Sequence, residues 1–77
     1  MDRLLGVFAE GLELPVERLN EQTSPDNTPE WDSLAAMTLV ALLEETFSIA
    51  LTTAEIMRMR TIGAVRDVLR AKGVPDV

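Results

Sequence analysis

The residues best suited to chemistry in this chain stand together and read Asp32-Ser33-Leu34. A serine hydroxyl can be a nucleophile when a neighbouring base activates it, or it can accept a covalent group such as a phosphate ester. The chain has no histidine and no cysteine, and its only lysine, Lys72, is far from this motif. Because nothing near Ser33 in sequence could activate its hydroxyl, we do not expect a hydrolase or any catalytic residue. Since histidine and cysteine, the commonest zinc ligands, are absent, we also expect no metal site.

The motif stands where an amphipathic helix over residues 32–47 is expected to begin. Asp32 is a good N-cap, because its carboxylate can accept a backbone N–H of the first turn. Ser33 should then lie on the surface at the helix tip, where the N–H groups and the positive end of the helix favour a phosphodiester. The pattern directs six residues toward solvent: Leu34, Met37, Thr38, Ala41, Glu44 and Glu45. The first half of this outer face is apolar, which favours a docking surface.

Three further helices are expected, over residues 2–14, 53–59 and 61–71. Gly11 should weaken the last turn of the first helix, and Pro15 should stop it. A polar loop over residues 15–31 follows, and loops of this length in compact domains are often functional. With no convincing strand, we expect one all-α domain over residues 1–77, a small bundle of three main helices plus one short helix with a long first loop.

Composition and charge narrow the partners of such a domain. The net charge is −6, so nucleic acid is a poor partner. The charge is uneven, with ten acidic and two basic residues over 1–45 (net −8) and three acidic and five basic over 46–77 (net +2). The acidic half is either a solvated surface or a face toward a partner. No apolar stretch approaches the roughly 20 residues of a membrane span, and the start lacks a signal-peptide layout, so we expect a cytoplasmic monomer.

Over nearly its whole length the chain resembles the acyl carrier proteins and the related peptidyl carrier domains. The resemblance rests on Asp32-Ser33-Leu34, on Leu43-Glu44-Glu45-Thr46-Phe47 at the end of the same helix, and on Thr61-Ile62 at the start of the last helix. It implies that a phosphopantetheinyl transferase attaches 4′-phosphopantetheine from coenzyme A to Ser33, with Asp32 and Leu34 in the recognition motif. The thiol of this arm would carry acyl or aminoacyl groups as thioesters, and the protein would be a non-catalytic carrier.

The resemblance also implies a partner-facing surface. Its partners would be the transferase and a loading ligase, acyltransferase or synthase, and its contact residues would be Leu34, Met37, Thr38, Ala41, Glu44 and Glu45. Trp31 departs from the family pattern, in which a small residue often precedes the Asp-Ser pair, and we expect the indole to pack over the loop. This feature and the uncharged first half of the second helix favour a dedicated pathway of polyketide, nonribosomal peptide or surface-polymer type.

One alternative stays open from sequence alone. A small helical interaction module could keep the carrier fold, never be modified, and use the Leu34, Met37, Ala41 and Glu45 face for its contacts. Serine and aspartate at a helix start are also ordinary capping chemistry. Whether Ser33 is modified distinguishes the carrier from the unmodified interaction module.

Overall fold

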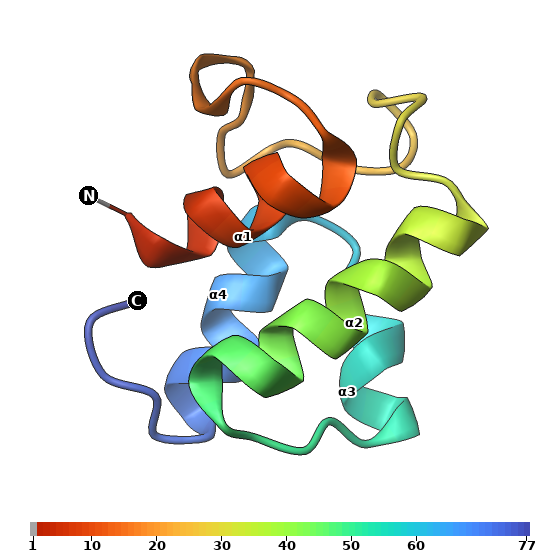
Figure 1. Cartoon of the computed structure of the whole chain (residues 1–77). Coiled ribbons are helices and arrows are strands. Elements are labelled where there is room, and N and C mark those ends of the chain that lie inside the picture. Colours follow the sequence, from red (N-terminus) through yellow and green to blue (C-terminus); the bar gives the residue numbers. More distant parts are fainter. Residues whose placement is uncertain (1) are drawn as a thin grey trace.

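The fold is a bundle of helices, described for residues 2–77 by a computed structural model (Figure 1). Its elements in chain order are α1 (Arg3–Leu12), the short 3₁₀ helix η1 (Val16–Arg18), α2 (Ser33–Phe47), α3 (Thr53–Arg58) and α4 (Ile62–Ala71). No strand occurs among the described residues. The predicted all-α bundle of three main helices and one short helix is therefore confirmed.

Side-chain caps explain where the helices begin. Asp2 Oδ1 accepts the N–H groups of the first turn of α1, at 3.0 and 3.3 Å. Thr61 Oγ1 caps α4. At α3, Thr52 and Glu55 form a reciprocal capping box, with bonds of 2.8 and 3.1 Å. The helix expected to run to residue 14 ends at Leu12, because the next residue, Glu13, adopts a left-handed conformation with φ of 55°.

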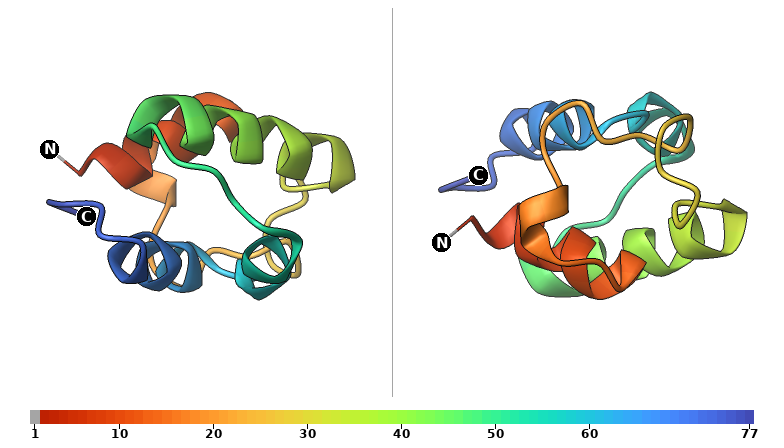
Figure 2. Two further views of the ribbon diagram at one scale, coloured as in Figure 1. Left: turned by 90° about the horizontal axis from the view of Figure 1, so that it is seen from below. Right: turned by 90° about the horizontal axis from the view of Figure 1, so that it is seen from above.

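The core lies between two layers of helices. Figure 2 shows α1 and α2 on one side and α3 and α4 on the other, with the connecting segments between them. The most deeply buried large side chains come from three helices and are Leu4, Phe8, Leu39, Leu43, Ile62, Val65 and Leu69. This core is assembled from apolar faces that no single helix could bury alone.

The long first loop is held against the start of α4 by hydrogen bonds. The N–H groups of Ile62 and Gly63 donate to the carbonyls of Thr23 and Glu21, each at 3.0 Å. Leu19 and the polar residues Thr23, Ser24 and Thr28 are buried, and the described residues include no buried side-chain polar atom without a hydrogen-bond partner. The loop is thus a packed part of the bundle that leads the chain to the start of α2.

An ion-pair network joins the start of α1, the loop and α4. Arg66 Nη2 lies 2.8 Å from both Asp2 Oδ2 and Glu21 Oε2. Burial raises the pKa of Asp2, but the hydrogen bonds from Arg66 and from the N–H groups it caps outweigh burial and lower it. The hydrogen bond from Arg66 lowers the pKa of Glu21, and its two acidic partners raise the pKa of Arg66. The network therefore stabilises the fold while both acids are ionised.

The start of α1 and the C-terminus lie at the end of the molecule away from the start of α2 (Figure 1). There the Arg3 guanidinium donates to the carbonyl oxygen of Thr46 at 3.3 Å and lies 4.9 Å from the centroid of the Phe47 ring. A cation at this position also suits the negative end of α2. As for membranes, none of the helices within residues 2–77 combines the length and the hydropathy that a bilayer crossing needs.

Candidate attachment site at the start of the second helix

Asp32 and Ser33 form the start of α2 as the sequence predicts. Asp32 has an extended backbone, and its Oδ1 accepts the N–H of Ala35 at 2.8 Å. Ser33 is the first residue of the helix and is exposed. The capping carboxylate orders the first turn. The Ser33 hydroxyl therefore stands open to solvent, at the positive end of a 15-residue helix.

Trp31, the residue before this pair, is part of the core. We expected it to pack over the loop, but only 5% of its surface is exposed, and its ring lies 5.1 Å from that of Phe8, tilted by 60°. An indole buries a large apolar area, which favours a place in the core over a place on the surface. Trp31 thus anchors the chain directly before the exposed Asp32 and Ser33.

The outer face of α2 is exposed over its first turns and strongly apolar. Leu34 is 74% exposed and Met37 is 71% exposed. On α3, Met57 is 71% exposed and Ile56 is 37% exposed. The sequence predicted a short helix here but placed neither Ile56 nor Met57 on a contact surface, although apolar residues on so short a helix are a usable signal. Large apolar side chains clustered on an exposed surface mark a contact site more often than singly scattered ones do.

Of the six residues expected to face solvent on α2, the structure leaves five exposed: Leu34, Met37, Thr38, Ala41 and Glu45. Glu44 is half-buried, and its Oε2 accepts the N–H of Leu51 at 2.9 Å. The chain turns at Ser48 and returns beside the last turn of α2, which brings a backbone donor that needs an acceptor. The Glu44 carboxylate is therefore engaged in the α2–α3 connection.

Two shallow hollows, one at the start of α2 and one on the neighbouring α3, share the lining residue Pro25. One, of about 250 Å³, is lined by Pro25, Trp31, Asp32, Ser33 and Ala36. A second, of about 270 Å³, lies toward α3, with Pro25, Met57 and Arg60 among its lining residues. Since Pro25 lines both, the surface beside Ser33 continues toward α3.

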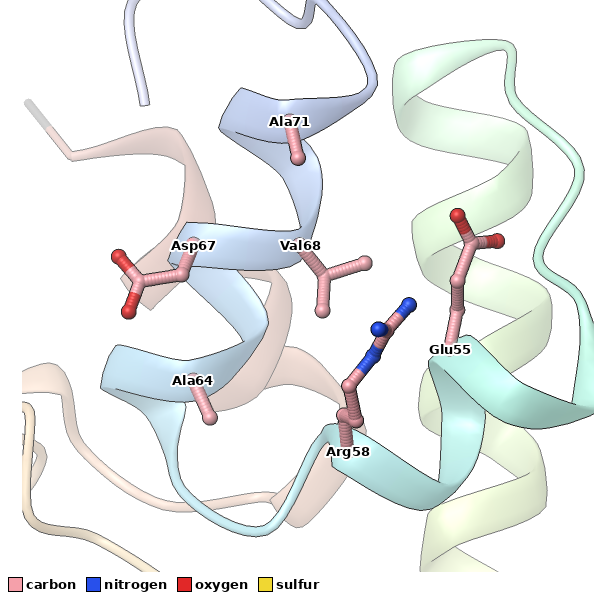
Figure 3. Close-up of a pocket in the computed structure, with 6 residues that line it drawn as sticks. All are labelled: Glu55, Arg58, Ala64, Asp67, Val68 and Ala71. Carbon is pink, nitrogen blue, oxygen red and sulfur yellow. The ribbon is translucent and has the colours of Figure 1, made fainter.

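A larger hollow, of about 450 Å³, lies between α3 and α4. Figure 3 shows Glu55 and Arg58 on α3 facing Val68 on α4, with Asp67 pointing away from α3. Lys72 Nζ holds the Glu55 carboxylate at 2.9 and 3.0 Å, and the N–H of Thr52 together with Lys72 lowers the pKa of Glu55. The lining offers no hydroxyl group, and nowhere in residues 2–77 do three or more acidic side chains gather where they could hold a metal ion.

A family comparison covers this site and the helices around it. The model of the phosphopantetheine attachment site family matches residues 2–69, from α1 almost to the end of α4. The chain belongs to this family of acyl and peptidyl carrier proteins. The comparison with curated proteins gives no significant match.

This family membership confirms the resemblance to acyl and peptidyl carrier proteins that the sequence showed. The phosphopantetheine attachment domain is the site of covalent attachment of 4′-phosphopantetheine, so the protein is a phosphopantetheine-carrying carrier protein. Carrier domains of this kind are generally non-catalytic and interact with modifying and loading enzymes. The exposed hydroxyl of Ser33 fits such an attachment, because a phosphodiester there would remain in solvent and face the positive end of α2.

Proposed function

We propose that the protein is an acyl carrier protein that holds acyl or aminoacyl intermediates on an arm attached to Ser33. The observation that carries this proposal is the exposed Ser33 hydroxyl at the first position of α2, directly after the capping Asp32. The chain has two other serines. Ser24 is buried in the loop, and Ser48 lies at the C-terminal end of α2, where the helix dipole disfavours a phosphate.

For the attachment reaction, this chain needs to supply only an accessible hydroxyl group. Ser33 Oγ forms a bond to the pantetheine-bearing phosphorus of coenzyme A, and the bond from that phosphorus to the bridging oxygen breaks. The 3′,5′-adenosine bisphosphate leaves with the electron pair, and the hydroxyl proton passes to a base of the transferase. Asp32 already accepts the N–H of Ala35, so we assign it to positioning the helix start and to recognition. The arm, when attached, supplies the thiol that forms the thioester.

The exposed apolar residues at the α2 start are the proposed contact surface for partner enzymes. Leu34 and Met37 flank the attachment point, and Thr38, Ala41 and Glu45 extend the same exposed face. Glu44 is the weakest member of the set implied by the resemblance, because its carboxylate is bound to Leu51. We propose the transferase and a loading ligase, acyltransferase or synthase as the partners. Exposed acidic residues would then raise the rate of encounter more than the affinity.

A dedicated biosynthetic pathway, of polyketide, nonribosomal peptide or surface-polymer type, is the proposed setting. The first half of α2 carries no charged residue, and the exposed Arg58 and Arg60 make the neighbouring α3 surface basic. Trp31, bulky where many carriers have a small residue, supports the same choice. A partner for this surface would make mainly apolar contacts beside Ser33.

Intact-mass spectrometry tests the proposal directly. The purified protein is incubated with coenzyme A and a broad-specificity phosphopantetheinyl transferase, and we expect a mass gain of one phosphopantetheine. Ser33→Ala should abolish the gain, whereas Ser48→Gly, which removes the exposed serine at the other end of α2, should retain it. No gain with several transferases would refute the carrier proposal and favour the unmodified interaction module.

A further inference from the structure

The hollow of about 250 Å³ beside Ser33 joins the attachment residue to an apolar surface. Its lining combines Ser33 and Asp32 with Pro25 from the loop, Ala36 from the first turn of α2, and an edge of the largely buried Trp31. These apolar residues come from the loop and from the first turn of α2, and the folded protein places them beside one another. A group bonded to Ser33 Oγ therefore starts at the rim of a surface that can take up apolar atoms.

The walls of this hollow are fixed by their neighbours. The Trp31 ring packs against Phe8 in the core. Pro25 lies in a turn in which the N–H of Ser24 donates to Asn27 Oδ1 at 2.9 Å and the N–H of Asp26 donates to Ser24 Oγ at 3.2 Å. The proline ring also fixes its own φ angle. Because both walls are held in place, little conformational freedom is lost when a ligand covers them.

The chemistry of 4′-phosphopantetheine matches this surface. The arm begins with the phosphate and continues, within a few bonds, to a carbon that bears two methyl groups, its one branched apolar part. Contacts to Trp31, Pro25 and Ala36 would remove these methyl groups from water. The covalent link to Ser33 keeps the group at high effective concentration, so even a weak contact is populated.

We infer that the hollow lined by Pro25, Trp31 and Ala36 is a binding subsite for the dimethyl end of the arm. The inference rests on the proposed attachment at Ser33. It gives the arm a direction, since the subsite lies on the Pro25 side of Ser33 and Pro25 also lines the hollow that reaches Met57 and Arg60 on α3. The arm thus leaves the helix start along the loop and toward α3.

Proton NMR of the modified protein tests this subsite. Trp31 is the only tryptophan, so its indole N–H signal is unique and identifies the ring. We expect nuclear Overhauser contacts from the two methyl signals of the arm to the Trp31 indole and to the Ala36 methyl group. We also expect those methyl signals to be displaced from their positions in coenzyme A by the ring current of the indole.

A matched pair of variants locates the contact. Ala36→Leu fills the hollow and should remove the contacts to Trp31, while mass spectrometry still shows the modification. Ala54→Leu adds the same atoms to an exposed position on α3 and should leave the contacts unchanged. Persistence of the contacts in Ala36→Leu would overturn the assignment of the subsite.

The two proposals fail in distinguishable ways. A protein modified at Ser33 whose arm shows neither contacts to Trp31 nor displaced methyl signals overturns the subsite and leaves the carrier function intact. A protein that gains no mass overturns both.

Discussion

Replacing Gly11 by alanine should destabilise the protein, because the added methyl group would meet the second helix. A Cβ at this position would lie 2.6 Å from Leu39 Cδ2 and 3.3 Å from Leu42 Cδ1. Leu39 is only 2% exposed, so its side chain has little room to move. Gly6, on the same helix, is the matched control, because a Cβ there has no atom within 4 Å among those that could obstruct it.

The magnitude follows from two opposing effects. Alanine in place of glycine within a helix stabilises it by about 0.5–1 kcal/mol, and Gly6→Ala should show this gain. Forcing an extra methyl group into a packed core costs about 1–3 kcal/mol. Gly11→Ala combines the two effects, so we expect a net loss of roughly 0–2.5 kcal/mol, with a central value of about 1 kcal/mol. The difference between the two variants isolates the cost of overpacking and should be about 1–3 kcal/mol.

Urea unfolding monitored through Trp31 fluorescence measures both free energies of unfolding. Equal stability of Gly11→Ala and Gly6→Ala would refute the proposed close approach of α1 and α2. A double variant sharpens the test. Leu39→Val shortens the side chain that the new methyl group meets, so it should cost less in the Gly11→Ala background than in the wild type.

Three further predictions concern the ion-pair network, the helix ends and the faces of α2. Arg66→Gln should lower the free energy of unfolding at pH 7 by about 1–2 kcal/mol, less than for a fully buried pair because both acids are partly exposed. Folding lowers the pKa values of Asp2 and Glu21, so their contribution to the free energy of unfolding is present above about pH 4 and is lost as the pH falls through the lowered values. Acidification should therefore destabilise Arg66→Gln less than the wild type. Glu13→Gly and Ser48→Gly should each raise the free energy of unfolding by up to about 1 kcal/mol, because both residues have left-handed backbones, with φ of 55° and 54°. Met37→Glu should change stability by less than about 0.5 kcal/mol yet slow loading by partner enzymes, whereas Leu39→Asp should unfold or loosen the bundle.

Each of these has a control or a contrary result. Arg18 pairs with Glu30 at 4.0 Å on the surface, so Arg18→Gln should leave stability nearly unchanged at either pH. An equal loss of stability on acidification in Arg66→Gln and the wild type would show that the ion-pair network does not determine the acid sensitivity of the fold. At the end of α2, Ser48→Ala should not stabilise the protein, because alanine does not relieve the left-handed backbone as glycine does. Normal loading kinetics for Met37→Glu would remove Met37 from the contact surface.

The start of α2 was open to prediction because its determinants are local. The Asp32 cap, the exposed Ser33 and the apolar Leu34 and Met37 all follow from spacing within one helix. The caps at Thr52 and Thr61 are equally local. The family resemblance then assigned a role to a site whose geometry the helix pattern had already outlined.

What escaped prediction depends on contacts between distant parts of the chain. The Arg66–Asp2 pair joins residues 64 apart in sequence, and no local pattern marks it. The helix pattern places Glu44 in solvent, but the chain after α2 brings the N–H of Leu51 to its carboxylate. Gly11 reads as a weak point of its helix, yet the structure places it where α2 approaches closely. In each case the partner becomes apparent only when the layers are assembled.

The start of α1 and the C-terminus determine how the protein is oriented when it is immobilised. Both lie on the side of the bundle opposite the start of α2, so an anchor or a fused protein joined at either end would lie on the side away from Ser33 (Figure 1). An array of copies fixed to a bead or a sensor chip through either terminus should present every Ser33 outward, toward whatever enzyme is supplied in solution.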